Sequence, residues 1–202
     1  MHRTLHSPEV AVELTSGSIV MPLDFAELFN RDAPVEIDVG CGDGTFLVEM
    51  AAQNPARNFL GIERHAGRVD RVCHKVTRFG LGNVRILRLD LAYAISCLLP
   101  SESIAALHLL FPDPWPKRRH HRRRSVTSGF VKAVHRALAP GGLFHVTTDH
   151  AEYFRQIQRL TATQFTISGE PSEFPKTKFE QHFATTGTPI YRLLLRKISP
   201  LR

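Results

Sequence analysis

The sequence has few cysteines and no long apolar stretch. Its three cysteines, Cys41, Cys73 and Cys97, form no Cys-x-x-Cys pair, which argues against a disulfide framework or a zinc knuckle. No apolar run approaches the roughly 18 residues that a membrane span needs, and residues 1–14 lack the apolar core of a signal peptide. We therefore expect a cytoplasmic protein without a membrane partner.

Positive charge is in excess, and most of it lies in one short segment. The chain carries 26 Lys and Arg against 19 Asp and Glu, a net charge of +7. Nearly all of this excess comes from six cations, Lys117, Arg118, Arg119, Arg122, Arg123 and Arg124. Charges packed this densely repel one another unless a polyanion neutralises them, so nucleic acid is a better partner than a membrane surface. His120 and His121 lie among these cations, where a metal ion would be repelled, and we expect no metal site.

Strand-like and helix-like segments alternate from about residue 34 onward. Apolar segments typical of strands occupy residues 35–39, 58–62, 84–89, 104–111 and 143–148. Segments with helical spacing follow them, at residues 46–51, 65–79, 91–98, 127–138 and 150–161. These repeated units predict an α/β fold with a doubly wound, mostly parallel sheet. Two further strands, at 165–168 and 190–195, show no helical pattern between them, and an antiparallel hairpin is expected to complete a seven-stranded sheet.

The chain shows no internal boundary after its first segment. Residues 1–33 are expected to form an N-terminal extension that is partly helical, because Phe25, Leu28 and Phe29 have helical spacing. Residues 34–202 contain no repeat and no low-complexity stretch. We expect them to form a single domain.

Glycine or an acid follows nearly every expected strand. These positions are Gly40 to Gly44, Glu63, Asp90, Asp113 and Asp149. Ligands of open parallel sheets bind outside the carboxyl ends of the strands, so these groups are expected to converge on one cleft. The glycines would let the backbone approach a ligand. Thr45 stands where the dinucleotide-binding fingerprint has its third glycine, and a plain strand-to-helix turn is the alternative.

Three carboxylates are candidate ligand contacts. Glu63 could bind both hydroxyls of a ribose, and Asp90 could bind an adenine amino group; for each, the alternative is a solvated strand end. Glu36 lies inside an expected strand, where a buried carboxylate is costly unless it is paired. It either reaches the ligand or answers a nearby cation, and we favour the ligand.

Two loop motifs have open interpretations. Three prolines stiffen the segment 111–117 and hold Asp113 and Trp115 in non-helical conformations. Trp115 is the only tryptophan, and it either stacks on an extruded base or anchors the loop in the core. Thr177-Lys178-Phe179-Glu180 either contacts a nucleotide or forms a Thr-x-x-Glu capping box.

Together these motifs resemble the bacterial tRNA (guanine-N7-)-methyltransferases, class I S-adenosylmethionine-dependent enzymes with a Rossmann-like fold. The resemblance covers about residues 33–197 in family order. Its motifs are Glu36-Ile37-x-Val39-Gly40-Cys41-Gly42-x-Gly44, Gly61-Ile62-Glu63, Phe111-Pro112-Asp113-Pro114-Trp115-Pro116-Lys117, the following His/Arg run, Pro140-Gly141-Gly142, Thr148-Asp149 and Thr177-Lys178-Phe179-Glu180. Asp38 departs from the pattern, because the family more often has glycine there; it either faces the methionine moiety and contacts its ammonium group or needs another partner.

The resemblance implies transfer of a methyl group from S-adenosylmethionine to N7 of the variable-loop guanosine 46 of tRNA. The expected cofactor contacts are Glu36, Gly40, Gly42, Gly44, Glu63, Asp90 and Asp113. The expected tRNA contacts are Lys117, Asp149, Thr177, Lys178, Phe179 and Glu180, with Arg122, Arg123 and Arg124 binding phosphates. Asp113 is the expected catalytic residue. It would position the base and stabilise charge, since guanine N7 has no proton to remove.

Two other functions stay open. A nicotinamide-dependent dehydrogenase would share the glycine loop and Glu63, but it has no use for the cationic run. A tRNA-binding protein or chaperone with a vestigial methyltransferase site would use the run, but it has no need of Asp90 and Asp113. Either a monomer or a homodimer is compatible with the sequence. If all six cations engage phosphates, log K for RNA should fall with log salt concentration with a slope of about 4–5.

Overall fold

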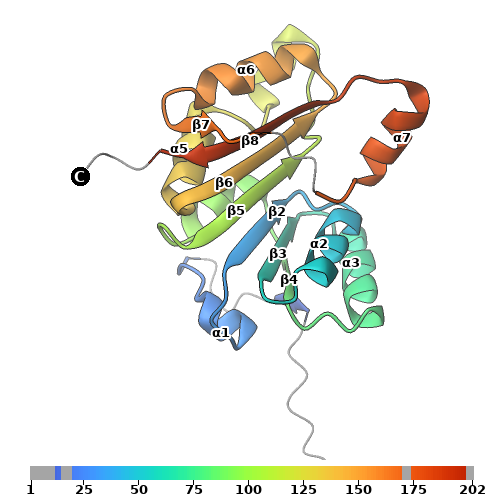
Figure 1. Ribbon diagram of the computed structural model, residues 1–202, viewed down its shortest axis with the longest axis vertical. Helices are drawn as coiled ribbons and strands as arrows, with labels where there is room; N and C mark the ends of the chain where they lie inside the picture. The colour runs from blue at the N-terminus through green and yellow to red at the C-terminus, as the bar shows by residue number, and fades with distance from the viewer. Residues whose placement is uncertain (1–11, 15–19, 170–173, 199–202) are drawn as a thin grey trace, which may run out of the picture.

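A single eight-stranded sheet forms the centre of the protein (Figure 1). The computed structural model describes residues 12–14, 20–169 and 174–198. The strands follow the order β1-β4-β3-β2-β5-β6-β8-β7, with five parallel and two antiparallel pairings. Their bounds are β1 Glu13–Leu14, β2 Val35–Val39, β3 Asn58–Glu63, β4 Val84–Arg88, β5 Ile104–Leu110, β6 Leu138–Thr148, β7 Phe165–Ile167 and β8 Tyr191–Lys197. The prediction of a doubly wound, mostly parallel sheet is confirmed.

The two ends of the sheet differ from the prediction. The strand count of seven is wrong within the described residues, because β1 pairs in parallel with β4. The segment before residue 34 also contains the expected helix, α1 Phe25–Phe29, which Asp24 caps by accepting from the backbone amides of Ala26 and Glu27. At the other end, β7 and β8 are antiparallel as expected, but β8 lies between β6 and β7.

A helix lies between β7 and β8, where no helical periodicity was found and only the capping-box alternative at Thr177–Glu180 indicated a helix start. It is α7, Lys178–Thr186, and Glu180 is its one buried residue within the described part of the chain. Phe179, on the same helix, is 61% exposed. The helix therefore has no continuous apolar stripe, which is the signal that a search for helical periodicity needs.

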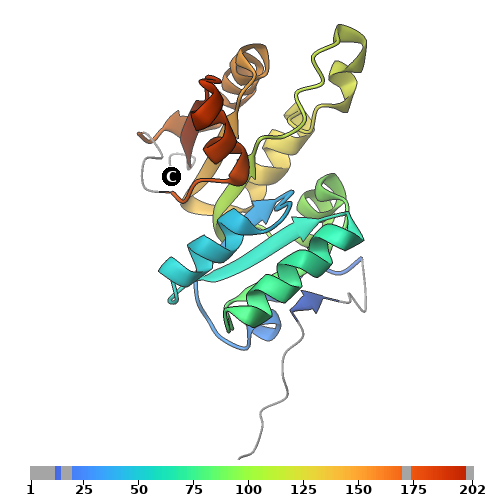
Figure 2. The same cartoon turned by 90° about the vertical axis from the view of Figure 1, so that its right-hand side faces the viewer.

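Helices cover both faces of the sheet. On one face lie α2 Thr45–Gln53 and α3 Ala66–Arg78, which run beside each other (Figure 2). The other face carries α4 Leu91–Tyr93, the π-helical turn η1 Ala94–Leu98, α5 Ser128–Ala137 and α6 Ala151–Thr161. Alternation along β2 sends Ile37 and Val39 into the core on the α5 and α6 side, and Glu36 and Asp38 to the opposite face.

The connectivity places a ligand-binding point beside β2. After β2 the chain builds the sheet outward through β3 and β4, and then returns to add β5 on the other side of β2. The order of strands therefore reverses between β2 and β5, and such a switch point leaves a crevice at the carboxyl ends of the strands. None of the helices in the described ranges combines the length and apolarity needed to cross a membrane.

Candidate active site

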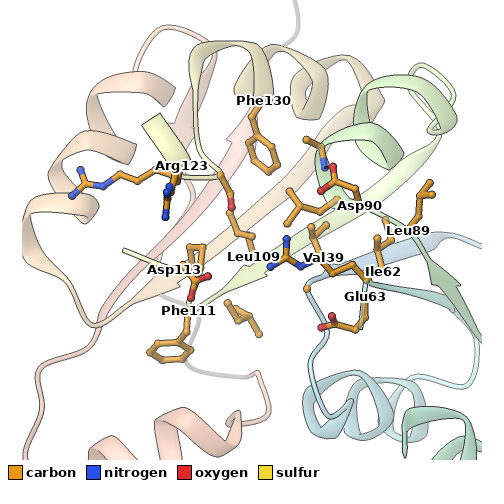
Figure 3. A pocket seen from close by; sticks show the side chains of 18 of the residues that line it. Val39, Ile62, Glu63, Leu89, Asp90, Leu109, Phe111, Asp113, Arg123 and Phe130 are labelled. Atoms are coloured by element: carbon orange, nitrogen blue, oxygen red, sulfur yellow. Dashed lines mark hydrogen bonds between the residues drawn. The ribbon is translucent and has the colours of Figure 1, made fainter. Parts of the chain in front are cut away.

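A cavity opens at the carboxyl ends of β2, β3, β4 and β5. Its volume is about 630 Å³, within the range of ordinary small-molecule sites. Figure 3 shows Asp113 and Arg123 on one side of it, with Glu63 and Asp90 on the other. Apolar lining comes from Val39, Ile62, Leu89, Leu109 and Phe130. Of the positions predicted to converge, Gly40, Glu63, Asp90 and Asp113 line the cavity, whereas Gly42, Gly44 and Asp149 do not.

The three glycines after β2 all have left-handed backbones, with φ of +72° at Gly40, +59° at Gly42 and +72° at Gly44. A Cβ added to Gly40 would meet nothing within 4 Å, and Gly40 lines the cavity, so a ligand can lie against its backbone. A Cβ on Gly44 would lie 2.6 Å from Cγ1 of Val72. Gly44 thus allows α2 to pack against α3, a different role from the predicted ligand contact.

Glu63 and Asp90 reach the cavity from neighbouring strand ends (Figure 3). Glu63 is 4% exposed, and its Oε1 accepts a 2.9 Å hydrogen bond from the backbone amide of His65. Asp90 caps α4 through Oδ1, which accepts from the amides of Ala92 and Tyr93 at 3.0 and 3.1 Å. Each carboxylate oxygen can accept more than one hydrogen bond, so both groups keep capacity for a ligand's hydroxyl or amino donors.

Glu36 is turned away from the cavity and is already paired. Its carboxylate accepts a hydrogen bond from Arg57 Nη1 at 2.9 Å and contacts His108 Nε2 at 2.9 Å. Burial alone would raise the pKa of Glu36, but the His108 hydrogen bond and the attraction of His108 and Arg57 outweigh it and hold the pKa below its usual value. The structure favours the alternative in which Glu36 answers a cation, and the preferred ligand contact has no support in its geometry.

Asp38, the position that departs from the family pattern, was not among the expected cofactor contacts. It lies two residues further along β2, directly before the glycine loop, and is 3% exposed. Among the described residues no donor is hydrogen-bonded to its side chain. Burial, followed by repulsion from Glu63 and Asp43, raises its pKa from 3.8 to about 7. A buried acid without a donor is costly, so Asp38 is poised for a cationic or hydrogen-bonding ligand. The Asp-x-Gly-x-Gly spacing was the available signal.

A buried polar chain runs from Glu36 across two strands of the sheet. His108 Nδ1 lies 3.2 Å from His145 Nδ1, and His145 Nε2 lies 3.2 Å from Thr147 Oγ1. Burial, with the nearby His108 and Arg192, lowers the pKa of His145 to about 2. The ring of Phe174 stacks on His145 with centroids 4.5 Å apart. None of these histidines was predicted, because each stands alone in an otherwise apolar strand.

The loop that carries Asp113 is held in an unusual backbone conformation. Phe111 has φ +51° and Trp115 has φ +43°, the left-handed region that non-glycine residues rarely occupy. Asp113 lies between them, exposed and facing the cavity (Figure 3). Strained residues of this kind cost free energy and persist where the surroundings fix them, which is common at functional sites.

Arg124 is the group that fixes this loop, and its predicted role in phosphate binding is wrong. Its side chain is only 1% exposed. Nε donates to the carbonyl oxygen of Pro114 at 2.8 Å, and Nη1 donates to Glu152 at 3.3 Å and also to Gln156, both on α6. The guanidinium also covers the ring of Tyr153 at 4.9 Å. With Nη2 also 3.0 Å from His121 Nε2, four of its five N–H groups are engaged inside the protein, and its side chain is buried away from an RNA backbone.

The other five cations of the run are exposed. They are Lys117, Arg118, Arg119, Arg122 and Arg123. Most of them lie on a 3₁₀ turn, η2 Arg118–Arg123, in a loop that projects away from the sheet (Figure 2). Among them Arg123 also lines the cavity. The run is thus a cationic surface at the rim of the site.

The Thr177–Glu180 motif forms the capping box that opens α7. Thr177 Oγ1 accepts from the amide of Glu180 at 3.1 Å, and Glu180 Oε2 accepts from the amide of Thr177 at 2.9 Å. Lys178 forms an ion pair with Asp43 in the glycine loop, and the ring of Phe179 lies 5.7 Å from that of Phe111. The motif therefore links both loops beside the cavity, without lining the cavity itself.

Comparison with known proteins places these features in one family. The chain matches the family model described as "Putative methyltransferase" over residues 32–193. It is 37% identical to the tRNA (guanine-N(7)-)-methyltransferase of Nitrosomonas eutropha, covering 87% of this chain and 82% of that protein. Identity to the protein of the same name from Alkalilimnicola ehrlichii is 38%, covering 87% of this chain and 78% of that one. Identity to the protein of the same name from Halorhodospira halophila is 35%, covering 94% of this chain and 84% of that one.

Solved structures with a similar fold are methyltransferases of low sequence identity. The 16S rRNA methyltransferase KamB superposes with a TM-score of 0.63 at 20% identity, covering 87% of this chain and 93% of that one. TrmN from Thermus thermophilus gives a TM-score of 0.61 at 18% identity, with coverages of 86% and 47%. At these identities the likeness establishes the class I methyltransferase fold alone.

Proposed function

Because this chain belongs to the tRNA (guanine-N(7)-)-methyltransferase family, we propose that it transfers a methyl group from S-adenosylmethionine to N7 of guanosine 46 in the variable loop of tRNA. One observation supports this above the others. Three carboxylates, Glu63, Asp90 and Asp113, meet in a cavity whose rim is an exposed cationic surface. A small cofactor fits the first feature, and an RNA backbone fits the second.

The residues of the cavity suit S-adenosylmethionine, which supplies an electrophilic methyl group when it is bound. Glu63 would accept from the ribose hydroxyls, and Asp90 from the adenine amino group. Asp38 does not line the cavity, but it lies two residues before Gly40, which does, and it would pair with the ammonium group, because a buried carboxylate without a donor gains most from a cation. Gly40 leaves open space for the ligand beside its backbone. Glu36 is assigned no cofactor contact, since its oxygens are bonded to Arg57 and His108.

Asp113 would hold the target base and favour its charge. Guanine N7 carries an in-plane lone pair and no proton, so the enzyme needs no general base at that atom. A carboxylate at Asp113 can accept from guanine N1–H and the exocyclic amine, which selects guanine over adenine. Its negative charge favours the cation that forms on the methylated ring. The stiff loop supplies the fixed position that such an effect requires.

The rim would bind the tRNA backbone. Lys117 and the exposed arginines of η2 would contact phosphates, which position the RNA without reading its sequence. We retain Asp149, Thr177, Lys178, Phe179 and Glu180 as proposed tRNA contacts, with the capping box presenting the start of α7 to the substrate. Residues 34–202 would act as one catalytic domain in the cytoplasm.

Methyl transfer to two matched transcripts tests this proposal. One is an unmodified tRNA transcript, and the other differs only by 7-deazaguanosine at position 46, which lacks the N7 lone pair. With labelled S-adenosylmethionine, we expect label in the first transcript alone. Equal labelling of both would refute the N7 assignment. Tight binding of both without any labelling would instead favour a tRNA-binding protein with a vestigial site.

A further inference from the structure

Trp115 belongs to the cavity and not to the core. It lines the cavity beside Asp113, is half-buried, and is absent from both clusters of buried apolar side chains. Two contacts of its ring come from the cationic loop itself. Arg123 Cζ lies 5.0 Å from the ring centroid, and His120 meets the ring edge-on at 5.8 Å. Trp115 is therefore a wall of the cavity with cationic and imidazole groups against its ring.

The backbone conformation of Trp115 also indicates a functional role for its side chain. A left-handed φ of +43° is unfavourable for a residue with a Cβ, and glycine would occupy it without cost. The indole therefore sits in a strained position at the wall of the cavity, outside the two buried apolar clusters. Strain of this kind is retained where the position of a side chain serves a function.

We propose that the indole of Trp115 is the platform on which the target guanine stacks, and that Arg123 covers this platform until the base arrives. This inference rests on the proposed function. Every base has a π face, and an indole ring beside Asp113 would let one residue stack on the purine while the other binds its edge. In the free protein, Arg123 lies over the ring of Trp115 in a cation–π contact.

Arg123 must leave the ring when guanine enters. Arginine next to guanine typically donates to O6 and N7 together, and a donor on N7 would occupy the lone pair that has to be methylated. RNA phosphates offer Arg123 a stronger partner than the ring does, because their charge is full and their geometry is bidentate. Exchange of Arg123 from indole to phosphate would thus couple backbone binding to the opening of the base site.

The single tryptophan makes this exchange measurable, because all tryptophan emission comes from Trp115. The probes are an unmodified tRNA transcript and the same transcript with an abasic residue at position 46. We expect the guanosine transcript to quench Trp115 emission and the abasic transcript to bind with much less quenching. Equal emission changes with the two transcripts would overturn the stacking role.

Two single-charge variants test the part played by Arg123. In the free protein, Arg123→Gln should make Trp115 more accessible to acrylamide, a neutral quencher. Arg122→Gln removes the same charge one position away, where no ring contact is present among the described residues, and should leave acrylamide quenching unchanged. Equal accessibility in the two variants would overturn the covering role.

Replacement of the ring itself completes the test. Trp115→Leu should weaken tRNA binding about 5- to 150-fold, the usual loss for one stacked base, while Trp115→Phe should recover most of it. No recovery with phenylalanine would overturn the platform. Failure of the proposed function would look different: the wild-type protein would transfer no methyl group to tRNA, whatever the emission of Trp115 showed.

Discussion

Arg124 donates a hydrogen bond from Nε to the carbonyl oxygen of Pro114 at 2.8 Å, and Pro114 directly follows Asp113. The same guanidinium reaches Glu152 and Gln156 on α6. The position of the Asp113 carboxylate thus depends on a helix that packs against the far side of the sheet from the glycine loop. Within one cationic run, Arg124 is buried, whereas Arg122 and Arg123 are exposed.

Asp113→Asn should separate chemistry from binding. The amide keeps the shape of the side chain but loses its charge, so it can neither favour the forming cation nor accept two donors from guanine equally well. We expect methyl transfer from labelled S-adenosylmethionine to fall about 10²-fold, as when one preorganised electrostatic contact is removed. The affinity for tRNA, measured by filter binding, should stay the same. A large loss of binding would mean that Asp113 mainly holds the loop.

Arg124→Gln should lower the stability of the protein, whereas Arg122→Gln should lower only the salt dependence of tRNA binding. Arg124→Gln breaks buried hydrogen bonds of a charged group, and we expect a loss of about 2–3 kcal/mol in the free energy of urea unfolding, together with slow methyl transfer. Arg122→Gln should leave the unfolding free energy unchanged and lower the salt slope of tRNA binding by about 0.7–0.9.

The burial of Arg124 also sets the expected salt dependence of tRNA binding. With Arg124 excluded, five exposed cations remain, and log K for tRNA should fall with log salt concentration by about 3.5–4.5. An unchanged slope in Arg122→Gln would place the RNA elsewhere. A smaller slope in Arg124→Gln, with the loop still folded, would contradict its internal role.

Glu36→Gln should destabilise the fold without weakening the binding of the cofactor. The carboxylate pairs with Arg57 and His108, and the neutral amide would bind both less well. We expect unfolding to become easier by about 2 kcal/mol, the range for hydrogen bonds to a charged group. The dissociation constant of S-adenosylmethionine, measured by calorimetry, should not change. Weaker cofactor binding at unchanged stability would restore the ligand contact that the sequence suggested.

Local signals made the central sheet predictable. The strands β2 to β5 are short apolar runs that end in glycine or an acid, and parallel pairing brings such ends to one edge. The cavity residues Gly40, Glu63, Asp90 and Asp113 follow from that rule alone. The insertion of β8 between β6 and β7 could not be predicted from local signals, because the pairing partners of distant strands are set by tertiary packing.

The remaining differences come from contacts that a linear pattern does not contain. Arg124 has the same charge as Arg122 and Arg123, and only the position of α6 makes it a buried anchor. Glu36 and Asp38 share one face of β2, and His108 on the neighbouring strand decides which of them is free for a ligand. α7 was not predicted as a helix because its apolar face is small, although the Thr-x-x-Glu capping box offered as one alternative marks its start.

Asp38→Asn should stabilise the free protein while weakening cofactor binding. Burial and two neighbouring carboxylates raise the pKa of Asp38 from 3.8 to about 7. An acid whose pKa is higher in the folded state binds more protons when folded, so its ionisation destabilises the fold. The penalty is absent below about pH 4, grows up to about pH 7 and is constant above that, reaching about 4 kcal/mol.

Urea unfolding of wild type and Asp38→Asn at pH 5 and pH 8 measures this penalty. Asparagine cannot ionise, so the advantage of the variant should be larger at pH 8 than at pH 5. Calorimetry at pH 8 should show weaker binding of S-adenosylmethionine, because the variant offers no charge to the ammonium group. Equal stability of the two proteins at both pH values would mean that a donor already neutralises Asp38. Unchanged affinity for S-adenosylmethionine would mean that Asp38 does not contact the cofactor. A variant that is more stable but binds the cofactor less tightly would show that Asp38 destabilises the fold and serves binding.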